Sequence, residues 1–319
     1  MKILALDSSG LVASVAIIAD GTLLAEYTVN YKKTHSQTLL PMLDEIAGMV
    51  ELDRKTIDAI AVAAGPGSFT GLRIGSATAK GLGLALGKPI IEVPTLAGIA
   101  YNLGFVRGLV CPVMDARRQQ VYSGIYRFEG DRLITVRDQM PVSVTELIAE
   151  LEGLNDELTS EGIIFLGDGV PVLREEADRT LSVQHSYAPA HLSMQRAGAV
   201  GVLAAHLYAE GKYVPAERHT PIYLRKSQAE QQRDRMNGNN TGNEPAESDL
   251  ISVQVEAASK VVAELRAKAQ MEADKDAEMK DDGTPGVSAQ PDVPDEIHEN
   301  RSQGENTECP EIRKAEDVL

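Results

Sequence analysis

A glycine-rich stretch at residues 65–75, GPGSFTGLRIG, follows an apolar run and precedes an alanine-rich segment. Glycine-rich turns between a strand and a helix often bind phosphate, because N–H groups at the helix start point at the anion. Neither standard phosphate motif is complete here. The Walker A lysine is missing, since Lys80 lies inside the following helical segment, and the dinucleotide spacing is one residue too long. The stretch alone therefore does not establish a nucleotide site.

Small residues also recur every four positions through this stretch. Each interior helical glycine costs up to about 1 kcal/mol relative to alanine, so several of them require a compensating interaction. A ridge of small residues lets another backbone approach closely. Two interpretations are open, namely packing of this helix on its own sheet or packing on a helix of another subunit. The ridge consists of Gly67, Gly71, Gly75, Ala79, Gly83 and Gly87.

Acidic residues end two apolar runs, with Asp7-Ser8-Ser9 after Ile3–Leu6 and Asp115 after Leu109–Met114. ATPases of the actin and Hsp70 type hold metal-bound phosphates at such positions, although aspartate at a strand end is also ordinary turn chemistry.

The six histidines show neither HxxxH nor HxxH spacing, so we expect no metal site. No serine lies in a GxSxG motif, and a hydrolase function has no support.

Charge is unevenly distributed along the 319 residues. Residues 1–225 carry 20 Lys and Arg against 25 Asp and Glu, a net charge of −5, whereas residues 226–319 carry 11 against 22, a net charge of −11. An acidic chain is a poor nonspecific binder of nucleic acid, because phosphate contacts need clustered Lys and Arg. If RNA is involved, we expect another subunit to supply most of the positive surface.

The two cysteines, Cys111 and Cys309, form neither a disulfide framework nor a CxxC motif, and Cys111 is expected in the core. The N-terminal apolar run is too short for a signal peptide. No apolar run approaches the roughly 20 residues of a membrane helix. We therefore expect a soluble, cytoplasmic chain with no membrane partner.

Short apolar runs and helical patterns alternate over the first hundred residues. Helical spacing predicts helices over Ser36–Val50 and Phe69–Leu86, and Thr95 is expected to cap another helix. Asp20-Gly21 predicts a hairpin turn between two strands. Strands are predicted at Ile3–Leu6, Val12–Ile18, Leu23–Val29, Ile57–Ala63 and Ile90–Val93.

The same order then recurs. The apolar run Leu109–Met114 is followed by Asp115 and the strand Val121–Tyr126, as Ile3–Leu6 is followed by Asp7 and a strand. Gly162–Leu166 is followed by Gly167-Asp168-Gly169 and a helix, which repeats the strand, Gly65-Pro66-Gly67 and helix of the first part. We interpret this as an internal duplication of a mixed α/β unit, with a boundary near residue 100. The expected parts are residues 1–100, residues 101–230 and a remainder at 231–319.

Residues 231–319 differ in composition from the rest. Residues 237–243 read NGNNTGN, a flexible polar linker, and residues 249–279 carry a narrow apolar stripe that predicts a helix. Residues 281–319 are rich in Asp, Glu, Pro and Gly, which is the composition of disorder. We therefore expect an acidic, mostly disordered tail.

Four segments together closely resemble one family, the TsaB proteins. They are ILALDSSG at 3–10, THSQTLLPML at 34–43, AAGPGSFTGLRIG at 63–75 and YLRKSQAE at 223–230. TsaB proteins are noncatalytic, TsaD-like subunits of the bacterial machinery that installs threonylcarbamoyl on the adenosine beside the tRNA anticodon. The resemblance covers residues 1 to about 230 and implies a duplicated ribonuclease H-like fold of the actin and Hsp70 type, a mixed sheet with flanking helices.

The resemblance implies partners rather than chemistry. It implies pairing with a TsaD-like catalytic subunit, a TsaE-like ATPase that joins the pair, tRNA reached through the complex and ATP used by the complex. No bound cofactor or catalytic residue is expected in this chain, and the sequence leaves open whether the chain alone is a homodimer or a monomer. The pairing helices would be Ser36–Val50 and Phe69–Leu86, with the glycines shaping the docking surface. The expected interface residues are His35, Leu39, Leu40, Leu43, Phe69, Thr70, Gly71, Arg73, Ile74 and Gly75, and a vestigial phosphate loop would comprise Asp7, Ser8 and Ser9.

Two other classes of function stay open from the residues. A nucleotide-dependent enzyme of the actin- or sugar-kinase-like fold, or a dinucleotide enzyme, would need phosphate ligands that the sequence does not complete. A glycoprotease-like peptidase would need a metal or a nucleophile. Nucleotide affinity of the isolated chain discriminates the first class.

Overall fold

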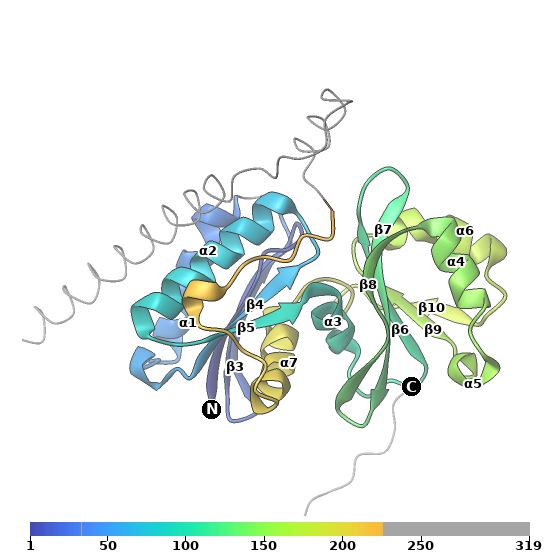
Figure 1. The fold of residues 1–319 in the computed structure, drawn as a ribbon. Coiled ribbons are helices and arrows are strands. Elements are labelled where there is room, and N and C mark those ends of the chain that lie inside the picture. The colour runs from blue at the N-terminus through green and yellow to red at the C-terminus, as the bar shows by residue number, and fades with distance from the viewer. Residues whose placement is uncertain (33, 226–319) are drawn as a thin grey trace, which may run out of the picture. The chain divides into compact units, whose positions relative to one another are not determined.

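The computed structural model describes residues 1–32 and 34–225 (Figure 1). The expectations for residues 231–319, including the helix at 249–279, lie outside the described residues. None of the helices in the described part of the chain combines the length and the hydrophobicity needed to cross a membrane.

The first lobe is built on a five-stranded mixed sheet in the order β3-β2-β1-β4-β5. β1 pairs antiparallel with β2 and parallel with β4. The turn between β2 and β3 has Asp20 and Gly21 at φ 49° and 79°, the left-handed pair of a tight hairpin, as the sequence predicted. The strands are β1 (Lys2–Asp7), β2 (Ala13–Ala19), β3 (Thr22–Val29), β4 (Ala59–Gly65) and β5 (Ile90–Pro94).

The second lobe repeats this topology. Its sheet has the order β10-β9-β6-β7-β8, with β6 antiparallel to β7 and parallel to β9. The strands are β6 (Leu109–Asp115), β7 (Gln120–Glu129), β8 (Arg132–Ser143), β9 (Ile163–Leu166) and β10 (His185–Tyr187). Two mixed sheets with identical strand order confirm the duplication inferred from the sequence.

Seven α-helices and three 3-10 helices occur among the described residues. The predicted helix at Ser36–Val50 is confirmed as α1, and the one at Phe69–Leu86 as α2 with the same bounds. The helices are α1 (His35–Met49), α2 (Phe69–Leu86), α3 (Thr95–Ala100), α4 (Val144–Glu152), α5 (Asp156–Thr159), α6 (Val170–Thr180), α7 (Ala197–Ala209), η1 (Arg54–Thr56), η2 (Tyr101–Leu103) and η3 (Ala216–Arg218).

One capping prediction was wrong. Thr95 is the first residue of α3 rather than its cap, and Pro94 occupies the cap position. The Thr95 hydroxyl instead accepts a hydrogen bond from the Gly65 backbone N–H at 3.1 Å. The side chain therefore ties the start of α3 to the end of β4, because a buried N–H without a partner would cost stability.

The two lobes share a central helical layer. Alternate residues of the first sheet point to opposite faces, so Leu4 and Leu6 pack with α1 and α2, whereas Ile3 and Ala5 pack with α3 and α7. The core on the second side also includes Val110 of β6 and other residues of the second sheet. The other face of that sheet packs against α4 and α6. Figure 1 shows α3 and α7 between the two sheets.

The end of the described chain returns to the first lobe. α7 packs on β1 and β2, although residues 197–209 follow the second sheet in sequence. Val214 then pairs with Ile90 of β5, and the chain runs along α2 to Arg225 (Figure 1). We call residues 214–225 the strap. The first lobe is therefore completed by residues far beyond the sequence boundary expected near 100.

Candidate functional site

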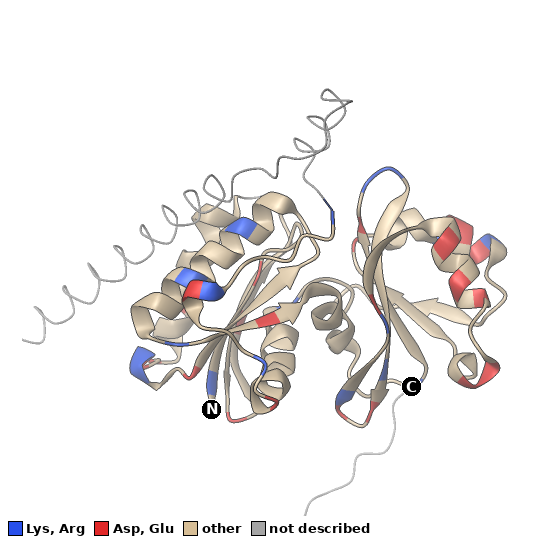
Figure 2. Ribbon diagram, in the orientation of Figure 1, with Lys and Arg blue, Asp and Glu red and all other residues tan. Residues whose placement is uncertain are grey.

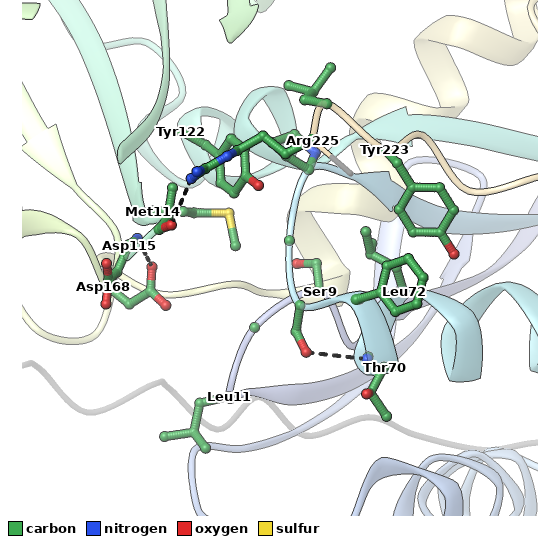
Figure 3. Close-up of a pocket in the computed structure, with 18 of the residues that line it drawn as sticks. Ser9, Leu11, Thr70, Leu72, Met114, Asp115, Tyr122, Asp168, Tyr223 and Arg225 are labelled. Carbon is green, nitrogen blue, oxygen red and sulfur yellow. Dashed lines mark hydrogen bonds between the residues drawn. The ribbon is translucent and has the colours of Figure 1, made fainter. Parts of the chain in front are cut away.

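A cavity of about 800 Å³ lies where the strand ends of the two lobes face each other (Figure 3). β1 and β4 of the first lobe, and β6 and β9 of the second, run parallel within their sheets, so their carboxyl ends meet at one edge. Ligands of open α/β sheets bind at such edges. The lining residues are Ser9, Gly10, Leu11, Thr34, His35, Pro66, Gly67, Ser68, Phe69, Thr70, Gly71, Leu72, Ile74, Met114, Asp115, Ala116, Arg117, Arg118, Tyr122, Asp168, Ile222, Tyr223, Leu224 and Arg225.

The first-lobe wall is the turn after β1, bonded to the start of α2. The Ser8 hydroxyl donates to the Gly71 carbonyl at 2.9 Å, and the Ser68 N–H donates to the Ser9 carbonyl at 2.6 Å. The Ser9 hydroxyl donates to Asp7 at 2.7 Å. Both serine protons are thus used inside the chain, which leaves these hydroxyls no proton to donate to a phosphate at the expected vestigial loop.

Asp7 is buried beneath this turn, with 1% of its surface exposed, and it does not line the cavity. Burial raises the pKa of Asp7 to about 6, because removal from water disfavours the charged carboxylate. Hydrogen bonds from the Ser9 N–H and hydroxyl act in the opposite direction but do not cancel this effect. Asp7 is therefore a structural carboxyl of the turn.

The glycines of α2 pack against this same turn. A Cβ atom on Gly71 would overlap the Ser8 carbonyl oxygen, and one on Gly75 would overlap the Ser8 hydroxyl. Gly83 likewise lies against Ala216 of the strap. The ridge therefore serves internal packing at these positions, one of the two interpretations that the sequence left open. The chain itself fills the space beside these glycines, so internal packing accounts for them, and the docking of a partner helix on α2 stays a prediction.

The second-lobe wall repeats the aspartate turn. The Asp115 carboxylate accepts from the Arg117 N–H at 2.7 Å, just as Asp7 accepts from the Ser9 N–H at 2.9 Å. Asp168 accepts from the Asp115 N–H at 3.3 Å (Figure 3). Burial raises the pKa of Asp168, with the nearby Asp115 charge a smaller cause. Each of the two carboxyls thus accepts a backbone N–H, and Asp115 also pairs with the Arg117 guanidinium at 3.1 Å.

The strap forms the third wall. The Ile222 N–H donates to the Ala64 carbonyl at 2.7 Å, at the end of β4. The Tyr223 ring lies 4.8 Å from the Phe69 ring, and the Arg73 Nε donates to the Tyr223 hydroxyl at 3.3 Å. The strap thereby covers the first turn of α2 and reaches the cavity.

The expected interface residues fall into two groups. Leu39 and Leu43 are buried on the inner face of α1, in the core, and Gly71 and Gly75 are buried against the turn. The others are at least partly accessible, and Thr70 is exposed. His35 lies at the cavity, where its Nε2 is 3.0 Å from the Gly10 carbonyl oxygen. The accessible group comprises His35, Leu40, Phe69, Thr70, Arg73 and Ile74.

A hydrogen-bonded Ser–His–Glu chain, not predicted from the sequence, fixes the strap to the first lobe. The ring of His219 lies between Glu92 Oε1, 2.7 Å from Nδ1, and Ser76 Oγ, 2.9 Å from Nε2. This sequence of contacts, from serine to histidine to carboxylate, resembles that of a hydrolase catalytic triad. However, Ser76 and His219 are 2% and 1% exposed and lie outside the cavity lining, so a substrate has no route to the serine. The arrangement anchors the strap.

Metal ligands are not gathered in the described part of the chain. No group of three or more His, Cys, Asp or Glu side chains there has the geometry to hold an ion. Cys111 is confirmed as a core residue, fully buried, and burial raises the pKa of its thiol to about 11.

Comparison with known proteins identifies the family. The model of the family described as TsaD, tRNA N6-adenosine threonylcarbamoyltransferase, matches residues 22–233. A tRNA threonylcarbamoyladenosine biosynthesis protein TsaB of Bacillus subtilis is 31% identical over 238 residues, which cover 72% of this chain and 96% of the relative. This chain belongs to the TsaB family. TsaB of Escherichia coli is 32% identical over 232 residues, with the same coverage of both chains.

A solved TsaB-like structure supports the assignment. A Pseudomonas aeruginosa protein described as similar to peptidase YEAZ is 27% identical, with a TM-score of 0.59 over 70% of this chain and 99% of its own. A second structure, YeaZ from the same organism, is 26% identical with a TM-score of 0.58. Family membership supports involvement in tRNA threonylcarbamoyladenosine biosynthesis.

Proposed function

We propose that this chain is a noncatalytic subunit that binds and activates a TsaD-like catalytic subunit, together with a TsaE-like ATPase. The reaction served is threonylcarbamoyl transfer to the N6 atom of the adenosine next to the tRNA anticodon. The observation that carries the proposal is the match to TsaB relatives along 96% of their length, which includes both lobes and the strap.

The site geometry agrees with a supporting role. The carboxyl of the first-lobe turn is buried, and the hydroxyls of that turn are consumed by internal hydrogen bonds. The serine of the Ser–His–Glu chain is enclosed. These observations disfavour the peptidase alternative and give no specific support to a nucleotide-dependent enzyme.

The proposed docking face is the outer side of α1 and the first turns of α2, without the buried glycines. Leu40 and Ile74 supply apolar area that water reaches only in part, and Thr70 and Arg73 supply polar groups. A mixture of apolar centre and polar border is typical of protein interfaces. The isolated chain would pair with a second copy through the same face.

Reconstitution tests this function. With tRNA, threonine, bicarbonate and ATP, the isolated chain should yield no modified adenosine, and the complete set of pathway proteins should yield it only when this chain is present. Modification by the chain alone, or full activity without it, would contradict the proposal.

A matched pair of variants tests the docking face. Leu40→Glu places a charge on the outer side of α1 and should weaken affinity for the TsaD-like subunit at least about tenfold, because an unpaired charge in an interface is costly. Leu24→Glu, at a residue 44% exposed on β3, is the control. Both variants should melt close to the parent. Equal binding by the two variants would place the interface elsewhere.

A further inference from the structure

Three arginines border the cavity, and we call Arg117, Arg118 and Arg225 the arginine rim. Arg117 and Arg118 lie in the loop between β6 and β7, where Figure 2 shows a blue segment, and both are exposed. Arg225 ends the strap and donates to the Ala116 carbonyl at 2.9 Å, and its side chain lies beside Tyr122 (Figure 3). The rim therefore gathers positive side chains from the second lobe and from the strap at one opening.

The positive charge of the rim is only partly compensated. Asp115 pairs with Arg117 at 3.1 Å and offsets one of the three charges. Arg118 forms no ion pair within the described part of the chain. The printed hydrogen bond of Arg225 goes to a neutral carbonyl. Residues 1–225 carry a net charge of −5, so the rim is a local positive site on an acidic body.

The loop that presents two of these arginines has an unusual backbone. Arg117, Arg118 and Gln119 have φ values of 67°, 57° and 57°, in the left-handed region. That region costs roughly 1 kcal/mol or more for each residue that is not glycine, and such residues cluster at ligand-binding positions. The Ala116 N–H donates to the Gln120 carbonyl at 3.0 Å and closes the loop. The loop therefore has a defined shape before a ligand arrives, which lowers the entropic cost of binding.

The interior of the cavity is less favourable for an anion than its mouth. Asp115 and Asp168 line the second-lobe wall. The Asp115 side chain is 24% exposed, whereas the guanidinium side chain of Arg117, its partner, is 79% exposed. A phosphate group inside the cavity would meet like charges, and one at the mouth would meet the arginines. The favourable position for a phosphate is therefore the mouth, on a ligand that extends outward.

Aromatic rings line the same cavity. The Tyr223 side chain is 37% exposed and lies next to Arg225 in the strap. Single-stranded RNA is recognised by arginines that contact its phosphates and by aromatic rings on which its unpaired bases stack. A rim of arginines beside such rings favours a single-stranded nucleic acid over a simple inorganic anion. The lining rings are Phe69, Tyr122 and Tyr223.

We propose that the arginine rim binds phosphate groups in a single-stranded segment of tRNA while this chain is paired with the TsaD-like subunit. This inference rests on the proposed function. Arginine matches phosphate through the planar fork of its N–H groups. Three arginines on an acidic chain form a weak site, because affinity for nucleic acid grows with the number of phosphate contacts. The rim therefore orients tRNA on the complex, and the isolated chain should bind tRNA only weakly.

The test uses the full chain in complex with the TsaD-like subunit and an unmodified tRNA transcript, with Kd measured by fluorescence anisotropy. Arg117→Asn with Arg118→Asn removes two charges, and asparagine tolerates the left-handed backbone. The Kd for tRNA should rise about tenfold at about 0.1 M salt, and the slope of log Kd against log salt should fall by about 1.5.

Two control variants separate charge from shape and from position. Arg117→Lys with Arg118→Lys keeps both charges and should retain most of the affinity. Arg132→Gln, at a residue 71% exposed on β8 and outside the cavity lining, should bind tRNA like the parent. Every variant is checked by melting temperature and by sizing of the complex.

The outcomes distinguish this inference from the function on which it rests. Failure of the parent chain to pair with the TsaD-like subunit would overturn both. Normal pairing and activation, with tRNA affinity unchanged by the double asparagine substitution, would overturn the rim alone. A higher KM for ATP at unchanged tRNA affinity would assign the rim to a nucleotide and overturn the RNA assignment. Loss of pairing in the double variant would make the rim part of the protein interface, which also contradicts the proposal.

Discussion

Gly71→Ala isolates the close approach of α2 to the turn after β1. The nearest atoms to an added methyl group belong to Ser8, whose carbonyl oxygen it would overlap and whose carbonyl carbon would lie 3.3 Å away, and to Ser68, whose Cβ would lie 3.4 Å away. Backbone cannot rotate aside as a side chain can. The helix start and the turn must therefore separate.

The magnitude follows from three effects. Overpacking costs about 1–3 kcal/mol. The separation strains the bonds from Ser8 to Gly71 and from Ser68 to Ser9, at about 1 kcal/mol in total. The helix propensity of alanine returns about 1 kcal/mol. We expect a net loss of about 2 kcal/mol in the free energy of unfolding, or about 4–8 °C in melting temperature for a chain of this size.

Gly48→Ala is the matched control. Gly48 also lies in a helix, α1, but an added Cβ there meets no atom within 4 Å. The substitution should raise the free energy of unfolding by up to about 1 kcal/mol. Both variants are compared by urea and thermal denaturation. If Gly71→Ala is as stable as Gly48→Ala, the close packing of α2 on the turn is refuted.

Two further predictions concern buried polar groups. Burial raises the pKa of Asp7 from 3.8 to about 6, so the folded chain binds this proton more tightly than the unfolded chain does. The free energy of unfolding should therefore fall by up to about 3 kcal/mol as the pH rises from about 4 to above 6. Asp7→Asn should abolish this fall in urea titrations at pH 4.5 and 7, whereas Asp20→Asn, at an exposed residue, should retain it. His219→Leu leaves the buried Ser76 and the partly buried Glu92 without the ring and should cost about 2–4 kcal/mol, against about 1 kcal/mol for Ser76→Ala. Equal losses in the two variants would show that the ring does not anchor the strap.

Strongly patterned elements were predictable from the sequence. β1, β2 and β4 read as apolar runs because both faces of the sheet are covered there, and α2 was predicted with its observed bounds. The paired motifs Gly65-Pro66-Gly67 and Gly167-Asp168-Gly169 revealed the duplication, and Gly65 and Gly167 both adopt positive φ, at 132° and 104°.

Other parts depend on contacts between distant residues and could not be predicted. α7 reads AGAVGVLAAHLYA and has no polar stripe, because it is enclosed in the central layer, so its partner was not evident. The Ser–His–Glu chain joins His219 to Glu92, which is 127 positions away in the sequence, and to Ser76, which is 143 positions away. The glycine spacing indicated close packing, but only the fold shows that the neighbour is Ser8 of the same chain.

The return of α7 to the first sheet has a consequence for synthesis on the ribosome. One apolar face of that sheet, which includes Ile3 and Ile18, is complete in sequence by residue 94 yet is covered in part by residues 197–209. At about 5–20 residues per second, the nascent chain exposes that face for roughly 5–20 s before its cover emerges. During this interval the first lobe is a target for holding chaperones and for aggregation, and codon changes that slow translation between residues 95 and 209 would lengthen the exposure.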